Sequence, residues 1–240
     1  MRALPRRAAP SLRLPVRGRH PRRLAGLAEQ LAVPVTALRE LPASVDAAAG
    51  ALAEPGGSAL RAVQAAAVGS GDRLLVLDPG TIGLLAAQFA LAHGAEVHVL
   101  GQTPESIRFA AGLGVAGAWA ARSLPKLRFD AVIDCSNAAG LPALALDLVE
   151  PGKQVVYVGL AGRPSAVDTR AMVLKDVTAV GILGGSAALA AAIGHYAAGS
   201  VDPRPLVAAT VGLGQVGDVL AGSRPVGAGP GPKILIDPRR

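Results

Sequence analysis

From residue 73 onward, the chain alternates between short aliphatic runs and longer segments whose apolar side chains recur at helical spacing. The predicted strands cover residues 74–77, 96–100, 131–134, 154–158 and 177–182, and the predicted helices cover residues 82–93, 104–113, 141–149 and 187–198. Because a helix separates most successive strands, the connections suit parallel crossovers rather than hairpins. The pattern therefore predicts an α/β fold with a doubly wound parallel sheet.

The region before residue 73 is less regular. Prolines interrupt residues 1–24 too often for a stable helix. Ser44 is the predicted N-cap of a helix over residues 45–53, which the Pro-Gly-Gly sequence at 55–57 should stop. A second helix is expected over residues 58–68.

A glycine-containing turn joins the first predicted strand to the first predicted helix. Residues 74–85 read LLVLDPGTIGLL, which matches the dinucleotide-binding pattern GxGxxG of Rossmann-type sheets except that Asp78 stands at its first glycine. In such a turn, glycines and helix N-terminal amides approach a pyrophosphate closely. The residues predicted to do so are Gly80, Thr81, Ile82 and Gly83. Asp78 places a carboxylate where a diphosphate would repel it.

The end of the second strand bears on the choice between NAD and NADP. An acidic side chain at this point usually binds the ribose 2′-hydroxyl of NAD. Gly101 stands there instead, and Gln102, Thr103 and Arg108 follow as hydrogen-bond donors for a 2′-phosphate. The sequence therefore favours NADP, with NAD as the alternative.

The formal charge of +7 comes from one end of the chain. Eight arginines fall within the first 23 residues, no acidic residue precedes Glu29, and the remainder carries a formal charge of −1. Because no aromatic residue or recognition fold accompanies these arginines, we interpret residues 1–24 as a solvated, disordered leader. The alternatives are a targeting segment and a non-specific contact with phosphates; no specific nucleic-acid partner is expected.

Cys135 is the only cysteine, which excludes an intrachain disulfide and a cysteine-rich zinc site in this sequence. It follows an aliphatic strand, so a buried thiol is expected rather than a nucleophile. A reducing, cytoplasmic location is the default expectation. No apolar run is long enough for a membrane span, so no membrane partner is expected.

Taken together, these segments resemble the cofactor-binding half of the zinc-type medium-chain dehydrogenase/reductase (alcohol dehydrogenase) family. The resemblance extends from about Leu27 to Pro238. The segments that match the family are residues 50–55, 71–76, 79–88, 129–136, 158–160 and 233–238. It implies a Rossmann-type domain with remnants of a GroES-like catalytic domain at both ends, and hydride transfer between NADP(H) and an alcohol or ketone.

The resemblance also implies further site residues. Cys135 and Ser136 would line the adenine side of the cofactor. The residues that would approach the nicotinamide are Val158, Gly159, Leu160, Leu183 and Gly184. Family members dimerise through the strand that corresponds to residues 177–182, which implies a homodimer here.

The sequence departs from the family pattern in its N-terminal part. Its members carry a zinc-binding catalytic domain there, whereas His20 is the only histidine among the first ninety residues. Glu54 matches a ligand of some members but cannot hold zinc alone, so no metal site is expected and the catalytic residues are unknown.

The expected organisation is a leader at 1–24, a catalytic-domain remnant at 25–57, a dinucleotide domain at 58–200 and a catalytic-domain segment at 201–240. Loss of the zinc domain would impair hydride transfer, and the alternatives are a non-catalytic dinucleotide-binding module and a truncated gene product.

Overall fold

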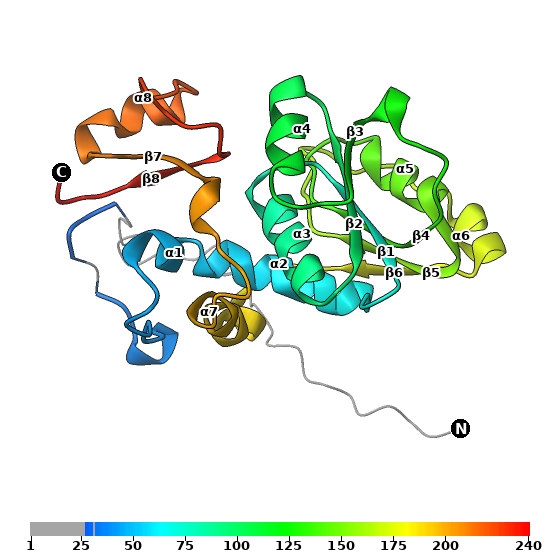
Figure 1. Cartoon of the computed structure of the whole chain (residues 1–240), viewed down its shortest axis with the longest axis horizontal. Coiled ribbons are helices and arrows are strands. Elements are labelled where there is room, and N and C mark those ends of the chain that lie inside the picture. The colour runs from blue at the N-terminus through cyan, green and yellow to red at the C-terminus, as the bar shows by residue number, and fades with distance from the viewer. Residues whose placement is uncertain (1–26, 31) are drawn as a thin grey trace, which may run out of the picture.

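The computed structural model describes residues 27–30 and 32–240, and its centre is a six-stranded parallel sheet (Figure 1). The strand order is β3-β2-β1-β4-β5-β6, so the predicted doubly wound sheet is confirmed. The strands are β1 (Arg73–Leu77), β2 (Glu96–Gly101), β3 (Gly117–Ala120), β4 (Phe129–Asp134), β5 (Val149–Tyr157) and β6 (Thr178–Gly181). The leader predicted at 1–24 lies outside the described residues.

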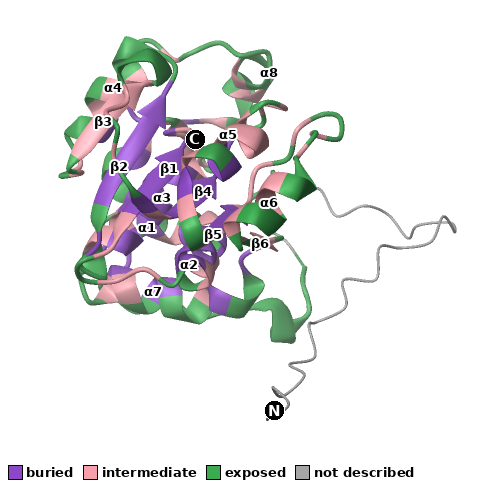
Figure 2. Ribbon diagram, turned by 90° about the vertical axis from the view of Figure 1, so that its right-hand side faces the viewer, coloured by how far each residue is buried: buried purple, intermediate pink, exposed green. Residues whose placement is uncertain are grey.

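Helices cover both faces of the sheet, and β1 shows why its strands read as unbroken aliphatic runs. Leu74 and Val76 face one apolar core, and Leu75 and Leu77 face the other. The first core is built against α2 (Ala53–Ala66), α3 (Thr81–Ala92), α4 (Pro104–Ala111) and α7 (Leu189–Ala197), and the second against α5 (Leu141–Leu148). The strands β1, β2 and β4 are consequently buried along most of their length, whereas the edge strand β6 and the outer helix surfaces are exposed (Figure 2).

The predicted helix stop at residues 55–57 is wrong, because α2 runs through it. Pro55 lies in the first helical turn, where its missing N–H is not needed. A Cβ at Gly56 would overlap the Tyr196 hydroxyl, and one at Gly57 would overlap the Gly185 carbonyl oxygen. The two glycines therefore allow close packing of α2 on the 185–196 region rather than ending the helix.

Several further elements differ from the expectation. Asp46, not Ser44, caps α1 (Ala47–Ala51) by accepting a hydrogen bond from the Ala49 N–H at 2.8 Å. Neither β3 nor α6 (Thr169–Lys175) was predicted. The C-terminal segment at 233–238, which contributes to the resemblance, contains strand β8 (Lys233–Ile236). It pairs in parallel with the unpredicted β7 (Val207–Val211), and α8 (Val216–Leu220) lies between them in sequence.

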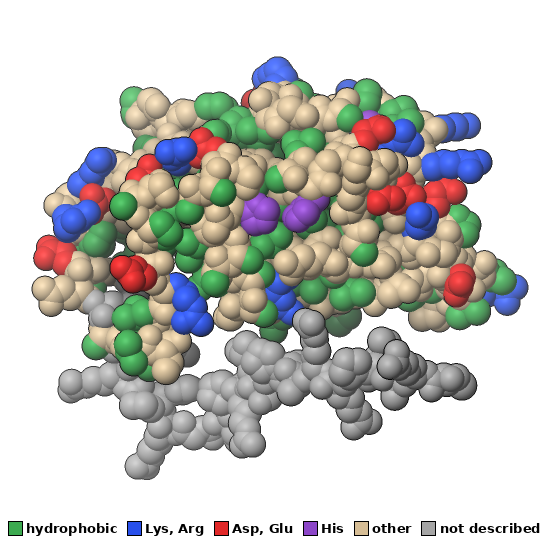
Figure 3. Space-filling view, turned by 60° about the horizontal axis from the view of Figure 1, so that its bottom comes forward, with side chains coloured by type: hydrophobic (Ala, Val, Ile, Leu, Met, Phe, Trp, Pro, Cys, Tyr) green, Lys and Arg blue, Asp and Glu red, His purple; other side chains and the backbone are tan. Residues whose placement is uncertain are grey.

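The surface of the described part mixes the two signs of charge. Basic and acidic side chains are interspersed over the face shown in Figure 3, which has no single-sign stripe of the kind that tracks a nucleic-acid backbone. No helix within residues 27–30 and 32–240 has the length and apolar character needed to cross a membrane.

An ion pair links the beginnings of β1 and β2. The Arg73 guanidinium donates to both carboxylate oxygens of Glu96, at 2.7 and 3.0 Å. The Trp119 N–H donates to Nδ1 of His98 at 3.1 Å, so Nε2 of His98 donates to Glu96 at 2.8 Å. Hydrogen bonds from Arg73 and then His98 lower the pKa of Glu96 from 4.5 to about 2.

This pair predicts one component of the acid sensitivity of the fold. The pKa of Glu96 is lower in the folded state, so its stabilisation is present above pH 4.5 and is lost as the pH falls towards about 2. Because the side chain is 43% exposed, solvent screening limits the contribution to about 1 kcal/mol. Urea unfolding at pH 6 and pH 3 should show a smaller loss of stability for Glu96→Gln than for the wild type. An equal loss in both proteins would contradict it.

Candidate functional site

The site lies where the sheet changes the direction of its connections. β1 has β2 on one side and β4 on the other, and the chain runs outward from β1 to β3 and then from β4 to β6. The loops that leave the carboxyl ends of β1 and β4 therefore diverge and leave a crevice between them. In open α/β sheets this crevice is the usual place for a ligand.

The turn from β1 into α3 has the geometry of a phosphate-binding turn. Gly80 is the N-cap of α3, and the first helical turn contains Thr81, Ile82 and Gly83. A Cβ at Gly83 would overlap the Asp78 carbonyl oxygen, so only glycine allows α3 to approach the strand this closely. The first amides of α3 lack partners within the helix and point towards the crevice, together with the positive end of the helix.

Asp78, at the first position of this turn, brings a carboxylate to the same place. Its φ of 78° is a conformation that favours glycine. Burial raises the pKa of Asp78, a hydrogen bond from the Gly80 backbone opposes this effect, and the neighbouring charge of Asp134 raises the pKa further. Burial likewise raises the pKa of Asp134, whose carboxylate accepts a hydrogen bond from the Ser136 N–H at 2.9 Å. The chain therefore places an acidic group at the N-terminus of α3.

The loops after β4 and β5 touch each other along their backbones. The N–H groups of Val158 and Gly159 both donate to the Asp134 carbonyl, at 2.9 and 3.0 Å. A Cβ at Gly159 would overlap the Ser136 carbonyl oxygen. Position 159 thus requires glycine, and the contact fixes one wall of the crevice.

Most of the predicted site residues meet in one cleft of about 620 Å³. It is lined by Asp78, Ile82, Gln102, Thr103, Ser106, Cys135, Ser136, Asn137, Val158, Gly159 and Leu160. The sequence prediction missed Ser106 and Asn137, whose polar side chains gave no motif. Burial raises the pKa of the Cys135 thiol, which disfavours the nucleophilic thiolate.

A second cavity, of about 650 Å³, adjoins the cleft at Gln102. Gly101 and Arg108 line it, as does Arg122, which the sequence prediction missed. A Cβ at Gly101 would lie 2.8 Å from the Ile107 side chain, so a larger residue there would displace that side chain. Two guanidinium groups therefore border this cavity, and the exposed Arg108 side chain pairs with Glu105 at 3.3 Å.

Residues 81–198 match the profile of a family described as zinc-binding dehydrogenase. The chain belongs to the zinc-binding dehydrogenase family. It is 29% identical over 157 residues to the sorbitol dehydrogenase of Halalkalibacterium halodurans, covering 60% of this chain and 46% of that protein. It is 29% identical over 204 residues to a putative D-xylulose reductase of Rhizobium meliloti, covering 77% of this chain and 57% of that protein. The chain thus spans about half the length of these curated relatives.

Solved structures described as dehydrogenases share the fold. A putative zinc-binding dehydrogenase from Sinorhizobium meliloti 1021, bound to NADP, superposes with a TM-score of 0.74 at 23% identity, covering 83% of this chain and 62% of that one. An alcohol dehydrogenase (rspB) from E. coli CFT073, complexed with NADH, gives a TM-score of 0.74 at 20% identity, covering 79% of this chain and 59% of that one. At these identities the similarity establishes the fold.

Five of the predicted residues line neither cavity, and three of them, Gly80, Thr81 and Gly83, belong to the turn into α3. Leu183 and Gly184 follow β6, and neither lines the cleft or the adjoining cavity. The Arg61 guanidinium, from α2, donates to their carbonyls at 2.7 and 2.6 Å. Arg61 therefore holds this loop in place.

The residues of the described part do not fit the catalytic zinc of the zinc-binding dehydrogenases. Within residues 27–30 and 32–240, no three His, Cys, Asp or Glu side chains come together as a metal site would require. Glu54 is exposed in the first turn of α2. We therefore derive no chemical step through zinc from these residues.

Proposed function

We propose that this chain binds a nicotinamide dinucleotide across the cleft at the switch point of the sheet. The observation that carries the proposal is the turn at Gly80 and Gly83, from which α3 begins beside the cleft, with Ile82 of its first turn in the lining. The diphosphate would lie over this helix end, the nicotinamide half beside residues 158–160, and the adenosine half in the cavity beside Gly101. Two solved neighbours, described as bound to NADP and complexed with NADH, support this assignment.

We further propose that the bound dinucleotide is NADP. The cavity beside Gly101 contains no carboxylate and is bordered by Arg108 and Arg122. Guanidinium groups bind phosphate through charge-assisted hydrogen bonds, and no acidic side chain in the lining repels a 2′-phosphate.

This assignment predicts a selective effect of removing the guanidinium groups. Arg122→Gln and Arg108→Gln should each weaken NADP⁺ binding about tenfold and leave NAD⁺ binding within a factor of about two, because only NADP⁺ carries the 2′-phosphate. Isothermal titration with both dinucleotides measures the effect. Arg170→Gln, on the exposed helix α6, is the matched control. An equal loss for both dinucleotides, or tighter binding of NAD⁺ by the wild type, would overturn the preference.

The reaction class follows from the family. The relatives are described as sorbitol dehydrogenase and D-xylulose reductase, so we propose hydride transfer between NADP(H) and an alcohol or ketone, with the dinucleotide supplying or accepting the hydride. The second candidate is a non-catalytic dinucleotide-binding module, favoured by the half-buried carboxylate of Asp78 beside the proposed diphosphate position. Titration with NADP⁺ tests binding, and a panel of polyols and ketones, with metal analysis, tests turnover. Binding without turnover of any substrate would favour the module.

We also propose the assignment of the flanking segments. Residues 58–200 form the dinucleotide domain, and residues 25–57 and 201–240 correspond to the family's catalytic domain. The edge strand β6 presents exposed Thr178, Ala179 and Gly181, and unpaired edge strands are templates for pairing with a second chain. A homodimer through β6 would appear as twice the chain mass in light scattering, and Ala179→Pro, which removes an N–H from this edge, should return it to the monomer.

A further inference from the structure

One crossover of the sheet differs from all the others in the described part of the chain. The connections β1–β2, β2–β3, β4–β5 and β5–β6 contain the helices α3, α4, α5 and α6, respectively. The connection from β3 to β4, at residues 121–128, contains only a single turn of 3₁₀ helix at Ala121–Ser123. The sheet face on the α5 side therefore lacks the helix that a parallel crossover ordinarily places there.

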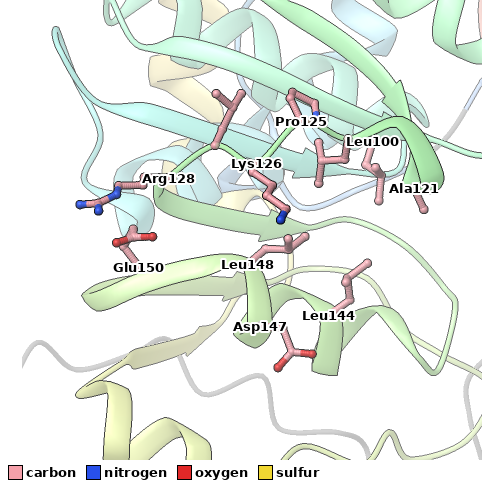
Figure 4. A pocket seen from close by; sticks show the side chains of 11 residues that line it. Leu100, Ala121, Pro125, Lys126, Arg128, Leu144, Asp147, Leu148 and Glu150 are labelled. Carbon is pink, nitrogen blue, oxygen red and sulfur yellow. The ribbon is translucent and has the colours of Figure 1, made fainter.

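A cavity of about 410 Å³ lies at this position, between the 121–128 loop and α5. Figure 4 shows Leu100 and Pro125 on one side and Leu144 and Leu148, from α5, on the other. Leu100 is buried, while the two leucines of α5 are partly exposed. We name this cavity the crossover trough; its volume lies within the usual range of small-molecule sites, about 300–1,000 Å³.

Lys126 is the polar group in the middle of the crossover trough. Its side chain extends from the loop into the space between the two apolar walls (Figure 4). Asp147 and Glu150 also line the trough, yet no ion pair or hydrogen bond joins Lys126 to any residue that the structure describes. By contrast, Lys153 pairs with Asp130 at 2.7 Å, and Lys175 donates to three carbonyls at the end of α5.

We propose that the crossover trough binds a small amphipathic carboxylate. Its aliphatic chain would replace water against Leu100, Leu144 and Leu148, where burial of each CH₂ contributes about 0.8 kcal/mol. Its carboxylate would accept hydrogen bonds from the Lys126 ammonium. The Arg128 guanidinium also lines the trough and, like Lys126, has no ion pair within the part of the chain that the structure describes. An apolar chain alone lacks a partner for the ammonium. An amphipathic amine is repelled by Lys126 but attracted by Asp147 and Glu150, so comparing the amine with the carboxylate tests which charges decide the specificity.

This site goes beyond the proposed function and does not depend on it. The crossover trough and the dinucleotide cleft have no lining residue in common. Ala121 borders both the trough and the cavity beside Gly101. Displacement by dinucleotide therefore distinguishes binding in the trough from binding in the cleft.

The chain carries its own reporter for this site. Trp119 is the only tryptophan. It pairs with Leu100 across the β2–β3 ladder and packs against the core that Leu144 and Leu148 also contact. A ligand between these leucines changes the environment of the indole, so tryptophan fluorescence of the full chain follows binding.

The test is a titration of the full chain with sodium octanoate, followed by Trp119 fluorescence. We expect a saturable change that NADP⁺ does not compete away and that octylamine does not produce. Lys126→Gln should weaken octanoate binding about tenfold or more, whereas Lys233→Gln, on β8, should leave it unchanged. Leu148→Phe, which fills the trough, should abolish binding while circular dichroism confirms the fold.

Four results would overturn the proposal. The first is the absence of a saturable change in Trp119 fluorescence when octanoate is added to the wild type, and the second is equal octanoate affinity of Lys126→Gln and the wild type. The third is equal binding of octylamine and octanoate, and the fourth is competition between NADP⁺ and octanoate. The last result would place the carboxylate in the dinucleotide cleft or in the cavity beside Gly101. None of the four contradicts dinucleotide binding, so the two proposals fail separately.

Discussion

Replacing Asp78 by glycine should raise the affinity for the dinucleotide about tenfold or more. The half-buried carboxylate lies at the N-terminus of α3, where the diphosphate would bind. Two opposite unit charges at about 4 Å interact by about 4 kcal/mol at an effective dielectric constant of 20, and like charges repel by the same amount. Removing the carboxylate therefore removes a repulsion larger than the 1.4 kcal/mol that corresponds to a tenfold change in Kd.

The same substitution separates charge from backbone strain. Asp78 has a φ of 78°, which glycine adopts without cost, so Asp78→Gly should also raise the melting temperature. Asp78→Asn keeps a side chain of the same shape and removes only the charge. If both variants bind NADP⁺ more tightly by similar factors, the charge is the cause; if neither does, Asp78 does not face the diphosphate.

The pH dependence has a defined sign. Because burial raises the pKa of Asp78, its carboxyl group becomes neutral at a higher pH than an ordinary aspartate. The wild-type affinity should therefore rise as the pH falls through this raised pKa, and that of Asp78→Asn should not. The ratio of the two Kd values at each pH cancels the titration of the 2′-phosphate, which both complexes share.

Gly159→Ala should destabilise the fold by about 1–3 kcal/mol and abolish detectable dinucleotide binding. The added Cβ would overlap the Ser136 carbonyl oxygen, and its nearest atoms are all backbone, so the β4 and β5 loops must separate. Their separation breaks the hydrogen bonds from Val158 and Gly159 to the Asp134 carbonyl. The wall of the cleft is then lost together with part of the stability.

A neighbouring glycine provides the control for this prediction. A Cβ at Gly162 meets no atom within 4 Å, so Gly162→Ala should leave both quantities near wild-type values. Urea denaturation measures the stability, and titration with NADP⁺ measures the binding. Equal behaviour of the two alanine variants would show that the contact between residues 136 and 159 does not shape the site.

The arrangement of the cleft could be predicted from the sequence because parallel strands bring their carboxyl ends to one edge. Once residues 74–77, 96–100, 131–134 and 154–158 were read as successive strands, the residues after each strand had to meet. Leu183 and Gly184 also follow a strand, but β6 is at the sheet edge and they line neither cavity. The strand order, which the aliphatic pattern does not specify, therefore determines which of these residues line a cavity.

Two omissions have physical causes. The sequence Gly-Ala-Trp-Ala of β3 lacks the β-branched residues that favour strands, and without β3 there was no reason to place Arg122 beside the site. The glycines of α2 were interpreted as a helix end because local propensity disfavours them. Their packing against residues 185–196, distant in sequence, overrides that propensity. The direction of the Asp78 carboxylate likewise depends on a backbone conformation that the motif alone does not give.

The close packing of α2 also has a consequence for synthesis on the ribosome. Its first turn contains Pro55, Gly56 and Gly57, which give little intrinsic helicity. Its partner Tyr196, whose hydroxyl donates to the Leu52 carbonyl at 3.1 Å, follows 144 residues later. The part of α2 that packs on residues 185–196 must therefore stay uncovered until the segment around Tyr196 leaves the exit tunnel, and during this interval the nascent chain is open to aggregation and to chaperone binding.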